Sequence, residues 1–442
     1  MRRIFSEYAY GAGPRSGCWW DETCDLPKGA ALQGAHRADV AIVGAGFTGL
    51  SAALHLAQAG ARVAVVEAQA PGWGASGRNG GFCCLGGGML SDDALDRRVG
   101  RAGRLEYRQA EQAAVTLVGD LIDTHRIEAD RHSNGETTLA HRPSDMDDLE
   151  RHAATVTENY GITPTLIAAR DLRDQGMAGP FHGALTVPVG FGLNPRKYLS
   201  GLLSAATAAG AQIHQHSPVR GLVRVGRHHA VQTDGGTVAA DQVVIATNGY
   251  SSEDLPDWLA GRYMPGQSNV MVTRPLSEAE VSASGWSSAQ MAYDTRHLLH
   301  YFRLMPDRRF LFGMRGGLMT GPSAERRARA RIRRDFDAMF PAWAHVDVHH
   351  NWSGMVCLAR DRLPFVGAVP DAPGLWAGLC YHGNGVAMGT YSGAILADLA
   401  QGKTPMRPYP AAMQRPLTRF PLGRARRAIM PLVYAGLTLA DR

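Results

Sequence analysis

Residues 39–67 constrain the possible fold of this chain most, because their pattern predicts a strand, a glycine turn, a helix and a second strand without interruption. The apolar run Val40–Val43 predicts a buried parallel strand, and the helical pattern after it ends at Gly60. A second strand follows over Val63–Val66. Parallel strands joined by a helix predict an α/β core.

Three glycines after the first strand have the GxGxxG spacing. Gly44 permits the tight turn, Gly46 lets the backbone approach a pyrophosphate, and Gly49 lets the helix pack closely on the strand. The positive end of that helix points at the phosphates. Glu67 ends the second strand, where a carboxylate accepts hydrogen bonds from a ribose diol. The unit predicts a bound dinucleotide and leaves NAD and FAD equally possible.

The length of 442 residues predicts two or three domain-sized units. The formal charge is +6, and only three of the 46 basic residues are lysines, which indicates an arginine bias and no nucleic-acid partner. The arginine-rich run 326–334 accompanies apolar residues at helical spacing, among them Ile332 and Phe336. A solvated helix face is therefore favoured over a phosphate site.

The chain lacks a signal-type N-terminus and an apolar run of about 18 residues, which predicts a cytoplasmic protein without a transmembrane segment. Six cysteines in so long a chain do not indicate a disulfide scaffold. Cys83 and Cys84 form either a redox pair or, as we favour, two small residues facing a ligand. The basic and apolar segment 424–440 fits a docked terminal helix better than a helix resting on a membrane.

A second glycine-rich loop, 71–82, follows the acid strand directly. Its five glycines predict a loop whose backbone approaches a ligand closely. The loop is not a GxSxG nucleophile elbow, because Arg78 stands where the last glycine belongs. A hydrolase is therefore disfavoured.

Two later segments also have patterns typical of a ligand-binding site. Strands are predicted at Val219–Val223, Ala230–Thr233 and Gln242–Ala246, the last ending in a turn beside a ligand. His228 and His229 fall in the hairpin and are expected at the surface, and no metal site is predicted. Near the C-terminus, a strand at 375–379, a glycine loop at 382–385 and a helix at 386–399 predict a second positive helix end, suited to an electron-rich ring.

The stretches between these units lack cofactor glycines, and His297–Gly317 reads as a hairpin with its turn at Pro306–Arg309. We therefore predict an α/β (α+β) fold, with a Rossmann-like dinucleotide domain and an interleaved substrate domain on an antiparallel sheet. The predicted cofactor domain comprises 36–134, 193–267 and 351–403, the substrate domain 135–192 and 268–350, and the C-terminal tail 404–442.

Two motifs carry a family resemblance. The loop Gly74–Gly81 reads GASGRNGG, and a later pattern places Trp352, Gly354, Arg360 and Pro364 in the order WxG and RxxxP. Over nearly its whole length the chain resembles the D-amino-acid oxidase and glycine oxidase superfamily of FAD-dependent amine oxidoreductases. Within it, these motifs are most similar to those of gamma-glutamylputrescine oxidases.

The resemblance implies FAD, with the glycine turn on its ADP half and the later loops flanking the isoalloxazine. The cofactor contacts that it implies are Gly44, Gly46, Phe47, Thr48, Gly49, Glu67, Ala68, Gly74, Ala75, Ser76, Arg78, Asn79, Gly80, Gly81, Val219, Thr247, Asn248, Gly249, Gly354, Arg360, Gly383, Asn384, Gly385, Val386 and Ala387.

Departures from the family pattern are informative. Val356 stands where glycine and D-amino-acid oxidases clamp the substrate carboxylate with an arginine, which argues against a plain α-amino acid. Gly354 falls near the cysteine that attaches flavin in sarcosine oxidases, so the resemblance implies non-covalent FAD, although Cys357 and Cys380 lie nearby in sequence. No lysine for oxygen activation occurs in 310–313, and Asn384 replaces a histidine common in relatives.

The expected reaction moves a hydride from the carbon beside a neutral amine to flavin, and water then hydrolyses the imine. Oxygen, giving hydrogen peroxide, or another acceptor would take the electrons. The alternative is a D-amino-acid or N-methyl amino-acid dehydrogenase or oxidase of the same fold. Candidate residues around the reacting amine are Arg78, His300, Tyr301, Trp352 and Tyr381.

Overall fold

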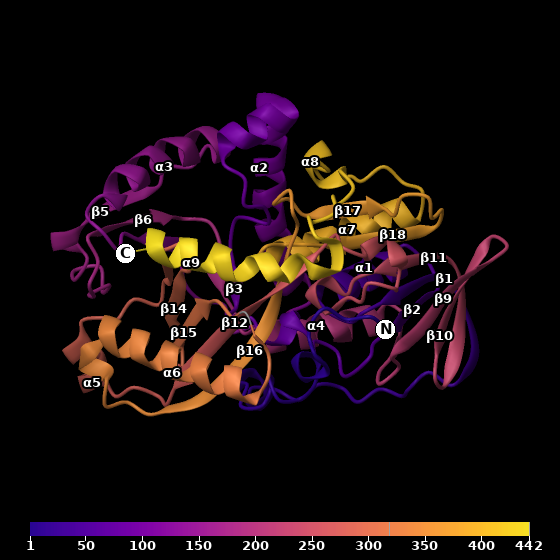
Figure 1. Ribbon diagram of the computed structural model, residues 1–442, viewed down its shortest axis with the longest axis horizontal. Coiled ribbons are helices and arrows are strands. Elements are labelled where there is room, and N and C mark those ends of the chain that lie inside the picture. The colour runs from indigo at the N-terminus through magenta and orange to yellow at the C-terminus, as the bar shows by residue number, and fades with distance from the viewer. Residues whose placement is uncertain (318, 442) are drawn as a thin grey trace.

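Two eight-stranded sheets organise the computed structural model, which describes residues 1–317 and 319–441 (Figure 1). The first sheet has the strand order β17-β18-β11-β1-β2-β8, and the β9–β10 hairpin is attached to β11. Its strands are β1 (Gly34–Val43), β2 (Val63–Val66), β8 (Gln212–His214), β9 (Val219–Val225), β10 (His228–Thr233), β11 (Gly236–Ile245), β17 (Phe365–Ala368) and β18 (Leu375–Leu379).

The centre of the first sheet is parallel. Strand β1 pairs with β2 and β11 on its two sides, and the register joins Val43 to Val66 and to Ile245. The three strands therefore end at the same edge, although the ends of β1 and β11 are about 200 residues apart in the sequence. This shared edge brings the glycine turn, the acid of β2 and the turn after β11 together.

Helices cover one face of this sheet: α1 (Phe47–Gln58), α2 (Asp92–Thr124), α4 (Pro195–Ala208) and α7 (Ala387–Ala400). Helix α1 is buried on nearly all sides, because it lies between the sheet and the helices α4 and α7. A Cβ on Gly393 would lie 2.3 Å from the carbonyl oxygen of Thr48, so the small residue is what lets α7 contact α1. The opposite face carries a second apolar cluster with the β9–β10 hairpin.

The second sheet has the order β16-β12-β15-β14-β13-β4-β6-β5, and all its pairs are antiparallel except β13 with β4. One face packs on α5 (Glu278–Ser284) and α6 (Pro322–Met339) through a cluster rich in phenylalanine and tryptophan. The strands are β4 (Glu136–Leu139), β5 (Thr165–Ala168), β6 (Gly183–Val187), β12 (Met264–Thr273), β13 (Met291–Asp294), β14 (His300–Leu304), β15 (Phe310–Arg315) and β16 (Val348–Leu358).

These sheets confirm the predicted fold class. The division into domain segments stays a prediction, and β12 and β16 run across its boundaries at 267 and 350. Ile332, Phe336 and Met339 are buried in α6, as expected for an amphipathic helix with a solvated arginine face. His229 is buried, contrary to the expected surface position, because its Nε2 lies 3.0 Å from the carbonyl oxygen of Pro373 in the loop before β18.

The C-terminal segment holds α8 (Ala411–Gln414) and α9 (Met430–Ala440), and Figure 1 shows α9 extending across the molecule toward the C-terminus. Asp441 accepts hydrogen bonds from the backbone amides of His297 and Leu298, and Arg142 donates to the carbonyl of Ala440. The C-terminal end of α9 is therefore attached to the loops beside β4 and β14, while no residue of the helix is buried. None of the helices in the described residues has the length and apolar character needed to cross a membrane.

Candidate cofactor and active site

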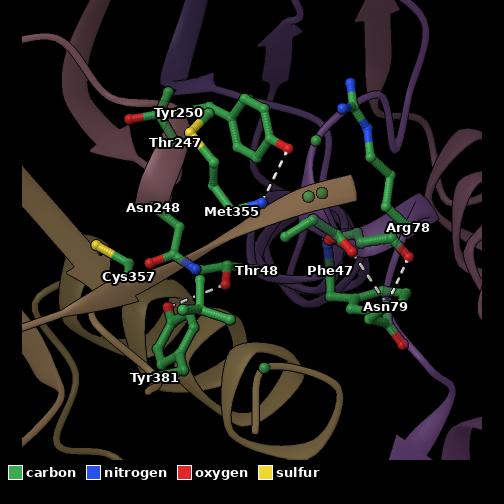
Figure 2. Close-up of a pocket in the computed structure, with 18 of the residues that line it drawn as sticks. Phe47, Thr48, Arg78, Asn79, Thr247, Asn248, Tyr250, Met355, Cys357 and Tyr381 are labelled. Carbon is green, nitrogen blue, oxygen red and sulfur yellow. Dashed lines mark hydrogen bonds between the residues drawn. The ribbon is translucent and has the colours of Figure 1, made fainter. Parts of the chain in front are cut away.

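A cavity of about 450 Å³ lies between the two sheets and is lined by residues of both. Its volume falls in the usual range for small-molecule sites. Figure 2 shows Arg78 and Asn79 on one side of the pocket, Thr247, Asn248 and Cys357 on the other, and Tyr381 below them.

The glycine turn is shaped by close backbone contacts. Gly44 has φ 105°, and a Cβ there would lie 3.0 Å from the carbonyl oxygen of Ala246. A Cβ on Gly49 would lie 1.9 Å from the carbonyl oxygen of Gly44, so α1 packs on the turn only with glycine at this position. At Gly46 a Cβ would meet the Oγ of Ser76 at 2.8 Å.

Glu67 follows β2 and lines the cavity. Its carboxylate accepts a hydrogen bond from the Ala45 amide at 2.8 Å and another from the Gln69 amide at 2.9 Å. Burial raises the pKa of Glu67, and these amide hydrogen bonds oppose the shift. Each carboxylate oxygen keeps a further lone pair for a hydroxyl donor.

The GASGRNGG loop lies over the start of α1. The Phe47 amide donates to the Oγ of Ser76 at 3.0 Å, which satisfies one of the free amides of that helix end. The side chain of Asn79 closes the loop on itself, accepting from the Gly81 amide and donating to the carbonyls of Ala75 and Ser76. Loop and helix start therefore form one rigid unit.

Arg78 reaches from this loop to β16. Its Nε donates to the carbonyl of Trp73 at 2.8 Å, its Nη1 donates to the carbonyl of Ser353 at 3.2 Å, and its Cζ lies 5.5 Å from the ring centres of both Trp73 and Tyr250. Burial lowers the pKa of Arg78, and Tyr250 partly offsets that effect. The buried Nη2 finds no hydrogen-bond acceptor within the described part of the chain.

The opposite wall comes from the ends of β11 and β18. Asn248 has φ 43° and accepts the Cys380 amide with its side-chain oxygen at 3.0 Å. Tyr381 places its hydroxyl 3.0 Å from the Oγ1 of Thr48, a contact that joins the loop before α7 to the start of α1 (Figure 2). Beyond it, the Asn384 side chain donates to the carbonyl of Leu85 at 2.8 Å.

The second sheet closes the far end of the cavity. Paired residues share a face of a sheet, and the register aligns Arg315 with Ser268 and Ser268 with Gly354. Tyr301, one strand further, places its hydroxyl 3.0 Å from the Oγ of Ser268. Burial raises the pKa of Tyr301. Arg315 donates from Nη2 to the carbonyl of His382 at 3.2 Å.

Most residues predicted for the site meet at this one cavity, although their roles stay predictions. Gly49, Gly81 and Gly249 lie behind it, where a side chain would approach neighbouring backbone, and Ala387 is buried next to the lining. The predicted residues that line the cavity are Gly44, Gly46, Phe47, Thr48, Glu67, Ala68, Gly74, Ala75, Ser76, Arg78, Asn79, Gly80, Val219, Thr247, Asn248, Tyr301, Gly354, Tyr381, Gly383, Asn384, Gly385 and Val386.

His300 does not lie in the pocket. Successive strand residues point to opposite faces, so Tyr301 faces the cavity and His300 faces α6. There its ring nitrogens contact the carboxylates of Asp294 at 2.8 Å and Asp335 at 3.4 Å. Burial opposes protonation of His300, but the two carboxylates outweigh it and raise the pKa.

Two further candidates are also outside the lining. The indole nitrogen of Trp352 donates to the carbonyl of Arg78 at 2.7 Å, and its ring packs against Trp20, so it supports the loop from behind. Arg360 lies exposed beyond the end of β16 and donates to the carbonyl of Arg419 at 2.9 Å. Neither residue is placed to contact a ligand in the cavity.

Other lining residues were missed by sequence reasoning, among them Glu136, Tyr250, Tyr293 and Arg315. Arg315 could have been found, because it stands two residues after Gly313 on the strand of the predicted hairpin. Glu136 is the first residue of the short strand β4, and nothing in the neighbouring sequence marks it as a residue of the site.

Comparison with known proteins decides the family. The DAO family model, described as FAD dependent oxidoreductase, matches residues 39–399. This chain belongs to that family. It is therefore an FAD-dependent oxidoreductase, and the match covers both the glycine turn and the α7 segment.

Relatives match over nearly their whole lengths. A probable oxidoreductase, OrdL, of Rhizobium meliloti is 31% identical over 96% of this chain and 97% of that protein. The gamma-glutamylputrescine oxidoreductase of Escherichia coli is 29% identical over 91% of this chain and 93% of its own. The crystal structure of glycine oxidase from Geobacillus kaustophilus covers 87% of this chain and 99% of its own, with a TM-score of 0.70 and 23% identity, and so has the same fold.

The residues present fit FAD. Glycines at 44, 46 and 49 leave the turn free of side chains, and Glu67 offers carboxylate oxygens at the ribose position. The buried Nη2 of Arg78 lacks an acceptor among the described residues, which a bound polar group would supply.

Proposed function

We propose that this FAD-dependent oxidoreductase oxidises the C–N bond of a small-molecule amine of the gamma-glutamylputrescine type. The observation that carries the proposal is the single cavity that joins the dinucleotide turn to a tyrosine-lined wall on the second sheet. The 29% identity to gamma-glutamylputrescine oxidoreductase, over 91% of this chain, supports the same substrate class.

Bound FAD would supply a hydride acceptor for the carbon beside the amine nitrogen, and hydrolysis of the resulting imine gives an aldehyde and ammonia or an amine. The protein favours the reactive neutral amine by excluding water, because desolvation lowers an amine's pKa. Tyr381, which is buried, and Tyr301, which is half-buried, line the cavity and serve this purpose. The guanidinium of Arg78 and the positive end of α7 favour negative charge that develops at the site.

Non-covalent binding of FAD is part of the proposal. Cys357 lines the cavity, but its Sγ lies 3.5 Å from the Sγ of Cys380, and the two thiols are buried together. Burial raises the pKa of Cys380 well above its usual value, which keeps it a thiol and a poor nucleophile. Acid denaturation should therefore release all of the flavin into the supernatant, and flavin that precipitates with the protein would contradict this part.

We further propose oxygen as the electron acceptor, with hydrogen peroxide as its product. No lysine stands on Phe310–Gly313, and all four of these residues are buried. The cation on this strand that faces the cavity is Arg315, two residues further. Its fixed positive charge is available to favour reduction of oxygen to an anion.

An anaerobic flavin-reduction assay tests the function. The purified, FAD-loaded protein is mixed with gamma-glutamylputrescine, putrescine, sarcosine and D-alanine in turn, and loss of flavin absorbance is followed. We expect the fastest bleaching with gamma-glutamylputrescine. Bleaching by D-alanine but not by gamma-glutamylputrescine would overturn the proposed substrate class.

The same samples then test the acceptor. The reduced protein is exposed to air or to an anaerobic dye, and reoxidation and peroxide are measured together. We expect reoxidation by air with stoichiometric peroxide. Rapid reoxidation by the dye and slow reoxidation by air would assign the enzyme to the dehydrogenases instead.

A further inference from the structure

Glu136 is a buried carboxyl group on the cavity wall that the second sheet forms. It is the first residue of β4, lines the cavity and is 8% exposed. Within residues 1–317 and 319–441 it forms no ion pair with a basic side chain, and the neighbouring acid Glu111 is itself paired with Arg108 at 2.8 Å. A buried carboxylate is stabilised by a positively charged partner, and a ligand of the cavity can supply one.

The register of the second sheet places two tyrosines beside Glu136. Met291 pairs with Glu136 across β13 and β4, so Tyr293, two residues further along β13, lies on the same face. Tyr293 pairs in turn with Tyr301 on β14, and both tyrosines line the cavity. Burial raises the pKa of Tyr293, and the nearby charge of Glu136 adds to that rise. An acid beside aromatic rings is a combination that binds alkylammonium groups.

Tyr301 connects this acidic part of the wall to the first sheet. A Cβ on Gly80 would lie 2.8 Å from the Cε2 of Tyr301, and a Cβ on Gly313 would lie 2.1 Å from its Cζ. The ring therefore fits between the GASGRNGG loop and β15. The row of Glu136, Tyr293 and Tyr301 thus leads from the acid to the loop that we propose holds FAD.

A cation on the same wall is separated from Glu136. Arg315 lies on β15, with β14 and β13 between it and β4, and it is not among the groups that shift the pKa of Glu136. Its guanidinium donates to the carbonyl of His382 at 3.2 Å. The acidic part of the wall is therefore suited to a positively charged ligand.

We propose that Glu136 binds the ammonium group of the substrate, with Tyr293 and Tyr301 beside it as aromatic walls, and accepts the proton that the amine must lose. One N–H proton moves from the ammonium group to an Oε of Glu136, which leaves a neutral amine and a neutral carboxyl group; no other bond changes. Because a cavity shielded from water solvates neither charge well, the neutral pair replaces the ion pair at little cost. This inference rests on the proposed function and adds the residue that recognises and deprotonates the amine.

The groups around Glu136 determine the pH at which it can act. Burial raises the pKa of Glu136 to about 7, the thiol of Cys84 opposes this shift by hydrogen bonding, and the charge of Glu111 adds to it. The thiols of Cys83 and Cys84 and the phenol of Tyr293 also face Glu136, and burial raises the pKa of each. These three groups therefore stay neutral near pH 7, where Glu136 titrates.

A cation that cannot be oxidised tests the binding site without turnover. tert-Butylammonium has no hydrogen on the carbon beside its nitrogen, and tert-butanol is a neutral analogue of the same shape. Each compound is titrated into the FAD-loaded protein and followed by flavin absorption and by calorimetry. At about pH 8 we expect about tenfold higher affinity for the cation. This affinity should fall about tenfold for each pH unit below about 7, because a protonated carboxyl group cannot pair with the cation.

Three variants make the binding test specific. Glu136→Gln should bind the two compounds equally at every pH. Glu278→Gln is the matched control, because it makes the same change in an exposed side chain on α5, and it should bind as the unchanged protein does. Glu136→Asp keeps the charge on a shorter side chain and should retain the pH dependence at lower affinity. It replaces Glu136→Gln should that variant purify without flavin.

The pH profile of anaerobic flavin reduction tests the proton transfer. With gamma-glutamylputrescine at low concentration, the unchanged protein should react fastest between the pKa of Glu136, about 7, and that of a free alkylamine, about 10. In Glu136→Gln the amine must arrive neutral, so the rate should be lower and should rise with pH up to about 10. A merely structural role of Glu136 would lower the rate by the same factor at every pH.

The outcomes are distinct. Equal binding of tert-butylammonium and tert-butanol by the unchanged protein would overturn the proposal, as would parallel pH profiles for Glu136→Gln and the unchanged protein. A shifted flavin reduction potential in Glu136→Gln, with the preference for the cation intact, would assign Glu136 to the cofactor instead. If no amine reduces the flavin but tert-butylammonium still binds through Glu136, the proposed function fails while the amine subsite stands. If amines reduce the flavin without any dependence on Glu136, this inference fails and the proposed function stands.

Discussion

The two walls of the cavity are built in different ways. The wall on the first sheet is a backbone structure, in which glycines at 44, 46 and 49 and the loop 74–81 bring main-chain groups to the ligand. The wall on the second sheet is a side-chain structure, in which Glu136, Tyr293, Tyr301 and Arg315 project from four neighbouring strands.

If the proposed function is correct, this difference separates cofactor binding from substrate choice. A backbone wall tolerates few changes, because Gly44 and Gly49 lie against neighbouring carbonyl oxygens and Gly46 lies against the Oγ of Ser76. A side-chain wall can change its chemistry one residue at a time while the sheet stays intact. The comparison therefore predicts folding and cofactor defects from substitutions in the first wall, and defects in charge and specificity from the second.

The largest effect is expected from Gly49→Ala. The added Cβ would lie 1.9 Å from the carbonyl oxygen of Gly44, so α1 must move away from the turn. We expect a loss of at least about 4 kcal/mol in stability and protein that purifies without flavin. Thermal unfolding and the flavin absorbance of the purified protein measure both effects.

Gly436→Ala is the matched control, because a Cβ there meets nothing within 4 Å in helix α9. It should keep full flavin content and a melting temperature that is unchanged or slightly higher, because alanine favours a helix over glycine. A yellow Gly49→Ala protein with the same melting temperature would refute the view that backbone contact shapes this wall.

The next effect concerns pH and the second wall. The folded-state pKa of Glu136 is raised to about 7 from an ordinary value of 4.5. The folded protein thus holds a proton that the unfolded chain has lost between these values, so stability falls as pH rises from about 4.5 to about 7. Glu136→Gln should remove a decline on the order of 3 kcal/mol, which leaves the variant relatively more stable at pH 8 than at pH 5.

Denaturant unfolding at a series of pH values measures this decline. The exposed ion pair between Asp234 and Arg220 provides a control. Asp234→Asn removes a surface carboxylate that pairs with Arg220. The stability of this variant should vary with pH almost as that of the unchanged protein does. Parallel stability profiles for Glu136→Gln and the unchanged protein would show that Glu136 is not buried as a neutral group.

A smaller effect is expected from Glu67→Gln in the first wall. The amide side chain keeps the shape but loses the charge that we propose accepts ribose hydroxyl groups, so affinity for FAD should fall about tenfold to a hundredfold. Fluorescence titration of the flavin-free protein measures the change. Asp39→Asn is the control, because it alters a carboxylate of the same unit that pairs with Arg62 at the surface. Equal FAD affinity in Glu67→Gln would remove Glu67 from the ribose site.

The first wall could be predicted from sequence because its requirements are local. The spacing of Gly44, Gly46 and Gly49 reports the turn directly, and β2, β18 and the hairpin of β14 and β15 lie where the patterns placed them. The predicted start of α7 is also correct to within a residue. In each case neighbouring residues carry the signal.

The second wall depends on register between distant strands. Alternation separates His300 from Tyr301, but it does not say which of the two faces the ligand; packing of the opposite face on α6 decides that. Glu136 and Arg315 line the same cavity from β4 and β15, although they are 179 positions apart in the sequence. A single sequence contains no local trace of this shared location.

Arg360→Ala should have the smallest effect. It tests the comparison of the two walls with a residue that belongs to neither wall. The family motif suggested a cofactor contact, but the side chain lies exposed beyond β16, bonded to the carbonyl of Arg419. We expect FAD affinity within about twofold of the unchanged protein and a stability change within about 0.5 kcal/mol. The same FAD titration and thermal unfolding measure both. A tenfold loss of affinity would mean that the motif arginine acts on the cofactor without lining the cavity, and that the first wall extends past its backbone cradle to the turn after β16.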